Sequence, residues 1–372
     1  MGSNPTPSGA AANDITTIRP VQTGTRILRL CAAGADPCTA TTQFVRYLQH
    51  SLPLSLARQQ KVMTNRQPAT SHRVSLLDAA LARCEAIFRL TESPNGFQRI
   101  NYLEPAGDPG VFGPGSVTWR VLSNPGSVFI GGITAVLLEL AEPRVRSGVW
   151  DHTDFLRDPV GRMRRTGLAA MVFTYGCRGD AEAAASRVRR LHERVKGITP
   201  DGQPYRADDP ELLTWVYVTA GYGFLSAYLR YVNPHLPWSE QDRYYSESLN
   251  SCRYYGIKWM PSSMAEAESY LERMRPKLRY HEIVEEFLRL VSNVPVMSAV
   301  ALPIQRLLIQ AAIDLLPSWA RRLLRLEQGQ SFRIATRPLV RAMVTLAGLI
   351  TRNGPPQQAC IRMGLSPSRL PY

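Results

Sequence analysis

The stretch DPELLTWVYVTAGYGFLSAYLRYV, residues 209–232, decides the fold class. Its opening Asp-Pro pair is typical of a helix start, because aspartate caps free amide groups and proline suits the first helical turn. Apolar residues then occur on nearly every side of the helix, and Arg230 is the only charged residue between positions 212 and 232. A helix that is apolar all round is buried inside a protein. We therefore expect this segment to be a core helix.

Other helices are marked by their own start and stop residues. Asp158-Pro159 opens one helix and Gly176 ends it, while Asp180 is expected to cap the next helix and Gly197 to stop it. Helical periodicity also marks residues 75–90 and the later stretches MAEAESYLERM (264–274), YHEIVEEFLRLV (280–291) and IQRLLIQAAIDLLPSWARRLLRL (304–326). The only strand signal is a small hairpin expected near SVTWRVL, residues 116–122.

These signals predict an all-α fold with one helical domain over residues 76–372. Residues 1–75 are expected to form a poorly structured N-terminal extension, and at least residues 1–25, which are small and polar, to be disordered. The 372-residue length and the 44% hydrophobic content allow a large core.

Composition narrows the function classes. The net charge is +14, but the basic residues are scattered singly and in pairs, without a basic run or a zinc-finger spacing, so we expect no nucleic-acid partner. The six cysteines form no CxxC pair, which is typical of reduced thiols in the cytoplasm. We expect no secretion signal and no transmembrane segment, although peripheral membrane contact stays open.

The stretch RRLHERVKG, residues 189–197, contains a histidine on the apolar side of its helix. At 100° per residue, His192 falls in an arc of about 120° together with Val188, Leu191 and Val195, whereas the arginines lie outside this arc. A histidine in such a place is either a core residue bonded to a carbonyl or a ligand. Without an HExxH motif or a second histidine nearby, a single imidazole suits haem better than zinc. Cys177 is a weaker candidate, as a haem thiolate.

The preceding helix carries Arg162 and Thr166 on one stripe with Phe173, and Arg165 flanks this stripe. Polar groups on an apolar stripe need partners, because burying them alone costs free energy. In one interpretation, Arg162 pairs with Asp154 or Asp158 and Thr166 bonds to a backbone carbonyl. In the other, the stripe lines a cavity that holds a ligand with acceptor atoms.

Several stretches together resemble the mpaB/rubber oxygenase catalytic-domain family. They are FGPGSVTWRV, EPRVRSGVWDHTDFLRDPVGRMRRT, RVRRLHERVKG with DGQPYRADDPELLTWV, and LLIQAAIDLLPSWARRLL, spread from about residue 112 to 324. The resemblance implies an all-α fold with a globin-like core, b-type haem, and oxygenase activity on hydrophobic, often isoprenoid, carbon chains.

The resemblance also implies roles for individual residues. His192 matches the histidine of an HxxVxG motif, the proximal iron ligand, and Arg162 and Thr166 match an RxxxT motif beside the haem. Phe173 and Val188 are expected to contact the macrocycle. Arg165 stands where a rubber oxygenase can carry an iron-binding lysine, but a guanidinium stays protonated.

The sequence departs from the family at two histidines. Glu142-Pro143 stands in place of an expected His-Pro, and Tyr217 replaces a histidine after Trp215-Val216. These changes concern the distal pocket and leave the substrate open. Glu139 or Glu142 is a candidate for the glutamate base of the family.

The sequence therefore predicts a cytoplasmic haem b oxygenase that uses O2 or peroxide on a hydrophobic small molecule, in a tailoring step of secondary metabolism. The alternative is a non-enzymatic helical protein that binds lipid or haem at a membrane surface through the basic segment SWARRLLRL, residues 318–326.

Overall fold

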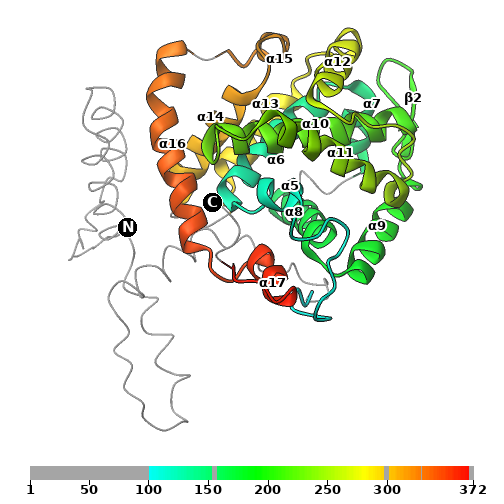
Figure 1. Ribbon diagram of the computed structural model, residues 1–372. Coiled ribbons are helices and arrows are strands. Elements are labelled where there is room, and N and C mark those ends of the chain that lie inside the picture. The colour runs from blue at the N-terminus through cyan, green and yellow to red at the C-terminus, as the bar shows by residue number, and fades with distance from the viewer. Residues whose placement is uncertain (1–99, 153–156, 297–300, 328, 368–372) are drawn as a thin grey trace, which may run out of the picture.

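A computed structural model describes residues 100–152, 157–296, 301–327 and 329–367. This part of the chain holds thirteen α-helices and one two-stranded sheet, which confirms the predicted all-α fold (Figure 1). The predicted helix at residues 75–90 lies outside the described residues, and the boundary between extension and domain stays a prediction. The elements are α5 (Val117–Val121), α6 (Pro125–Glu139), α7 (Pro143–His152), α8 (Pro159–Tyr175), α9 (Arg178–His192), β1 (Lys196–Ile198), β2 (Pro204–Arg206), α10 (Pro210–Tyr231), α11 (Trp238–Tyr255), α12 (Met264–Met274), the 3-10 helix η2 (Arg275–Lys277), α13 (Ile283–Asn293), α14 (Leu302–Leu315), α15 (Ser318–Leu323), α16 (Gln330–Ile350) and α17 (Pro355–Arg362).

Helix α10 crosses the centre of the molecule, as its apolar sequence predicts (Figure 1). Asp209 caps its first turn by accepting hydrogen bonds from the amides of Glu211 and Leu212, and Trp215 is fully buried. By length and composition α10 is the single described helix able to cross a membrane, and the bent pair Ile334–Ile350 with Pro355–Arg362 would count as another only if it formed one span. Packing inside the core explains the apolar sequence of α10 without a bilayer.

Helices α6 and α10 touch backbone to backbone where two glycines meet. A Cβ added to Gly131 would lie 2.8 Å from the carbonyl oxygen of Gly223 and 2.8 Å from Cα of Phe224. Such distances leave no room for a side chain, so glycine is required on both helices at this crossing. The close contact fixes the relative position of α6 and α10, which both supply polar residues to the candidate site.

Several helix boundaries agree with the predictions and others differ. Asp158 caps α8 with Pro159 at its first position, and Gly176 follows its end. The next helix begins earlier than predicted, with Cys177 at its cap position and Asp180 inside its first turn, and it ends at His192 rather than at Gly197. The segment 304–326 is interrupted by Pro317, because a proline cannot continue the hydrogen-bond ladder of α14.

The predicted hairpin at residues 116–122 is wrong. Residues Val117–Val121 form α5, because Ser116 caps the helix through the amide of Trp119, and the Glu247 carboxylate accepts hydrogen bonds from the amides of Val117 and Thr118 at 3.0 and 2.9 Å. The small hairpin instead joins α9 to α10, where Lys196–Ile198 pairs antiparallel with Pro204–Arg206.

Candidate active site

Helices α8 and α9 pack side by side and bring the RxxxT and HxxVxG stretches to one region (Figure 1). Arg162 lies in the first turn of α8, and its Nη1 donates to Oγ1 of Thr166 one turn later. Thr166 in turn donates to the carbonyl oxygen of Arg162 at 3.0 Å. This hydrogen bond agrees with the interpretation in which Thr166 bonds to a backbone carbonyl. Thr166 is nevertheless solvent-exposed.

The carboxylate of Asp158 pairs with Arg165 and not with Arg162. Nη1 of Arg165 lies 3.1 Å from Oδ2 of Asp158, so the two residues form an exposed ion pair at the start of α8. The other predicted partner, Asp154, lies outside the described residues. Among the described residues, the hydrogen bond to Thr166 is the only one that the Arg162 guanidinium makes to a side chain.

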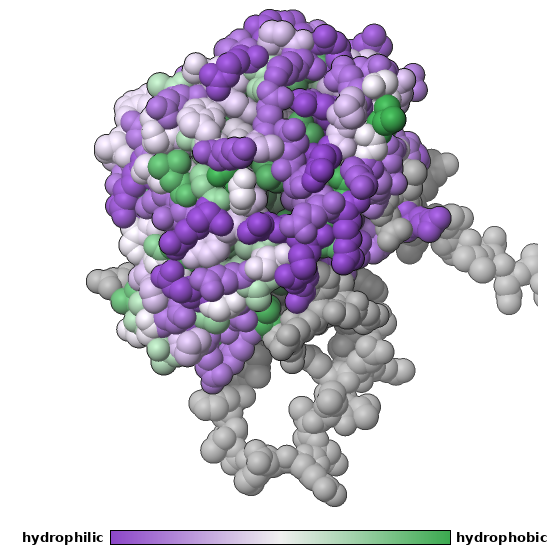
Figure 2. All heavy atoms as spheres, turned by 90° about the vertical axis from the view of Figure 1, so that its right-hand side faces the viewer, coloured by the Kyte–Doolittle hydropathy of each residue, from purple (hydrophilic) through white to green (hydrophobic). Residues whose placement is uncertain are grey.

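His192 is the last residue of α9 and is half-buried. Burial lowers the pKa of its imidazole, the positive charge of Arg162 lowers it further, and Asp208 opposes both effects. The imidazole is therefore neutral near pH 7, the form whose nitrogen lone pair can bind a metal. The arginines around His192 on α9 are solvated, and the corresponding side of the molecule is largely hydrophilic (Figure 2).

Leu191 does not share the inward position predicted for it. Its side chain is 54% exposed, although the helical wheel placed it at the edge of the apolar arc. Leu191 lies in the last turn of α9, which ends at His192. His192, nearer the middle of the arc, does turn inward.

Glu139, the last residue of α6, also interacts with Arg162 through its charge. Burial raises the pKa of its carboxyl group to about 7, against the opposing effects of Arg162 and Thr219. The Thr219 hydroxyl, fully buried on α10, lies 3.5 Å from Oε1 of Glu139. In turn, burial lowers the pKa of Arg162, whereas the charge of Glu139 raises it.

Arg162 is thus coupled electrostatically both to the carboxyl group of Glu139 and to the imidazole of His192. All three side chains keep part of their surface accessible, although burial is the main cause of each pKa shift. A carboxyl group with a pKa near 7 exchanges protons at neutral pH, and a neighbouring guanidinium binds anionic groups. The residues of this cluster can therefore bind an anion through Arg162, provide a neutral nitrogen ligand through His192 and transfer a proton through Glu139.

Glu142, the other glutamate predicted as a base, is held in a structural position. Only 2% of its side chain is exposed, Oε1 accepts a hydrogen bond from Nε of Arg144 at 2.8 Å, and Oε2 accepts one from the amide of Val145 at 2.8 Å. Both oxygens thus serve the start of α7. Of the two glutamates, Glu139 is the one that the fold places beside Arg162.

Phe173 lies in the last turn of α8, about three turns beyond Arg162, in an aromatic cluster against which Val188 packs. The ring of Phe173 packs edge-on against Phe112, Tyr254 and Tyr255, with centroid distances of 5.8, 5.5 and 4.9 Å, and Val188 packs against the same cluster. Protein side chains therefore already cover most of Phe173, which is 6% exposed.

Tyr217, which stands where the family was expected to carry a histidine, joins this aromatic cluster. The centroid of its ring lies 5.1 Å from that of Tyr255. Burial raises the pKa of Tyr217 well above its ordinary value, so the phenol stays protonated. Cys177, the alternative thiolate ligand, also has its pKa raised, mainly by burial, which disfavours the thiolate.

Two residues that act on the site, Thr219 and Asp208, were not among the residues predicted from the sequence. Asp209 is the residue that caps α10, whereas Asp208 forms two hydrogen bonds with Arg206, of 2.9 and 2.7 Å, and acts on His192 through its charge. The sequence does contain one indication for Thr219, because it is a polar residue in the middle of the apolar helix α10. The described residues contain no group of three His, Cys, Asp or Glu side chains able to hold a metal ion, so His192 is not part of such a cluster there.

Comparison with known families gives one match. Residues 119–369, well over half of the chain, match the family described as "ER-bound oxygenase mpaB/B'/Rubber oxygenase, catalytic domain". The match spans Glu139, Arg162, Thr166, His192 and Thr219 together. No curated protein and no solved structure matches the chain. The chain therefore belongs to the mpaB/rubber oxygenase family, whose matching region is an oxygenase catalytic domain.

Proposed function

We propose that this oxygenase binds b-type haem through His192 and oxidises a hydrophobic small molecule with O2 or peroxide. The observation that carries the proposal is the neutral, half-buried imidazole of His192 beside the Arg162 guanidinium. Haem needs one strong axial ligand from the protein, and its propionates are carboxylates that an arginine binds well. The donor set of this region therefore fits haem.

Each polar residue has a separate role in this proposal. His192 would hold the iron, and Arg162 with Thr166 would bind a propionate or orient a polar group of the substrate. The bound haem would supply the activation of the oxidant. Glu139 would accept or return a proton near pH 7, with Thr219 orienting its carboxyl group. None of these roles requires Arg165, which is paired with Asp158 at the surface.

The membrane-surface alternative has less support in the described residues. In the segment 318–326, Ala320 and Leu324 are fully buried, and Trp319 and Leu323 pack against the main core. The apolar side of this segment thus faces the protein and is not free to enter a lipid layer. The cytoplasmic location and the tailoring role in secondary metabolism stay predictions from the sequence.

Haem reconstitution tests the proposal. The full chain, expressed with a haem precursor, is expected to show a Soret band, and the His192→Ala variant is expected to lose it. His152→Ala is the matched control, because His152 lies exposed at the end of α7 with its Nε2 3.0 Å from the Tyr205 hydroxyl. Absence of the band in the unaltered protein would refute haem binding, and retention by His192→Ala would assign the ligand to another residue.

A further inference from the structure

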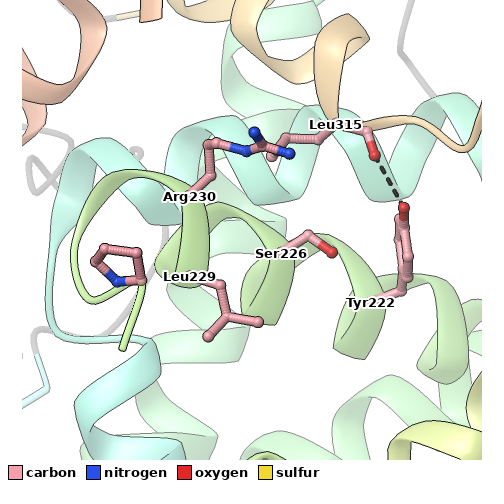
Figure 3. A pocket seen from close by; sticks show the side chains of 6 residues that line it. Tyr222, Ser226, Leu229, Arg230 and Leu315 are labelled. Carbon is pink, nitrogen blue, oxygen red and sulfur yellow. Dashed lines mark hydrogen bonds between the residues drawn. The ribbon is translucent and has the colours of Figure 1, made fainter. Parts of the chain in front are cut away.

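A cavity lies between the C-terminal half of α10 and the end of α14, away from the α8–α9 region. It has a volume of about 330 Å³ and is lined by Tyr222, Ser226, Leu229, Arg230, Pro234 and Leu315. None of these residues takes part in the candidate active site. Figure 3 shows that Tyr222, Ser226 and Arg230 project from successive turns of α10 around the same space.

The floor of this pocket is polar and already ordered. The hydroxyl of Tyr222 donates a hydrogen bond to the carbonyl oxygen of Leu315 at 2.9 Å (Figure 3). Ser226 lines the pocket one turn further along α10. The bond to Leu315 uses the phenolic proton, so Tyr222 is not itself a free donor.

Arg230 supplies the charge of the pocket. Its guanidinium is solvent-exposed and forms no hydrogen bond or ion pair with any residue that the structure describes. In Figure 3 it extends over the pocket toward Leu315. A guanidinium presents paired N–H groups that match the two oxygens of a carboxylate. The pocket thus contains one cation without a protein counter-ion among the described residues.

Three charged side chains affect the pKa of Tyr222, which lines the pocket. Arg230 and Arg321 favour a negative charge there, and the exposed Glu268 opposes it. Arg321 is itself held in place by the backbone carbonyl oxygens of Asp314, at 3.0 Å, and Leu316. Two basic side chains and one acidic side chain therefore lie around Tyr222, a balance that favours an anionic ligand.

We propose that this pocket binds a small organic monocarboxylate. The carboxylate would bind the Arg230 guanidinium with the Ser226 hydroxyl beside it, and a short apolar tail would contact Leu229, Pro234 and Leu315. The volume lies at the lower end of the range for ligand pockets, and the apolar walls favour an organic acid over a bare inorganic anion. This binding is additional to the oxygenase function and does not depend on haem.

Calorimetric titration of the full chain tests the proposal with three probes: butyrate, its neutral analogue 1-butanol, and inorganic phosphate. Butyrate is expected to bind saturably, and both other probes at least about tenfold more weakly, as loss of a charge-assisted contact implies. Arg230→Ala is expected to weaken butyrate about tenfold, and Glu268→Gln to strengthen it, since an opposing charge is removed.

Arg289→Ala is the matched control, because it removes an exposed arginine on α13 that pairs with Glu286. This variant is expected to leave butyrate affinity unchanged, and circular dichroism checks that each variant is folded. Unchanged butyrate affinity in Arg230→Ala would overturn the proposal. So would the absence of saturable butyrate binding, or phosphate binding at least as tightly as butyrate.

Discussion

Replacing Glu139 by glutamine tests the electrostatics of the candidate site without haem or substrate. Glutamine keeps the size of the side chain but cannot ionise. Burial raises the pKa of Glu139 from 4.5 to about 7 in the folded protein. Between these two pH values the folded chain holds a proton that the unfolded chain has released. The free energy of unfolding of the natural protein must therefore fall as the pH rises through this window.

The size of the effect follows from the shift. One pKa unit corresponds to about 1.36 kcal/mol, so ionised Glu139 destabilises the folded protein by on the order of 3 kcal/mol above pH 7. This is an upper value, because Glu139 keeps part of its surface accessible and solvent screens its charge. Below pH 4.5 the carboxyl group is neutral in both states, and glutamine resembles it closely.

Urea unfolding of both proteins between pH 5 and pH 8 measures this difference directly. Relative to the natural protein, Glu139→Gln is expected to become progressively more stable from pH 5 to about pH 7, and the difference is expected to level off above that pH. Glu211→Gln is the matched control, because hydrogen bonds from Arg144 and Lys277 lower the pKa of Glu211. That variant is expected to be less stable by a constant amount over the same range, since Glu211 titrates below it. A difference between Glu139→Gln and the natural protein that does not change with pH would refute the reasoning.

Two further predictions concern the helix crossing and the histidine. Gly131→Ala is expected to lower the free energy of unfolding by about 1–3 kcal/mol, because the new methyl group meets the α10 backbone, whereas Gly167→Ala, in open space on α8, is expected to raise it by about 0.5–1 kcal/mol. Denaturant titration checks both, and equal effects would contradict the close crossing. Arg162→Met is expected to raise the pKa of His192 in the haem-free protein, since Arg162 lowers it now. Proton NMR titration measures this pKa, and an unchanged value would contradict the proximity of the two side chains.

Helix starts and the core helix could be predicted from the sequence because their causes are local. Asp158-Pro159 and Asp209-Pro210 cap helices in the structure as predicted, and the apolar sequence of α10 matches its buried position. The hairpin was misplaced because the capping of α5 depends on the Glu247 carboxylate, 130 residues away from Val117. A distant carboxylate leaves no periodic signal in the segment that it caps.

Among the site residues too, those fixed by local periodicity could be predicted and those brought together by distant contacts could not. Helical periodicity places Arg162 and His192 on inward stripes, and the structure couples them through their charges. Glu139 and Thr219 lie close to each other because α6 and α10 are in contact, and two glycines allow this contact. Neither spacing nor residue type could distinguish Glu139 from Glu142, since only the fold shows that Glu142 caps α7.

The central claim is that His192 is the protein ligand of a haem iron. Resonance Raman spectroscopy of the ferrous, haem-loaded protein tests it through the iron–histidine stretching band, which must shift when histidine is labelled with 15N. The account predicts that this band is present in the natural protein and in His152→Ala and absent from His192→Ala. A nitrogen-sensitive band that persists in His192→Ala would contradict it.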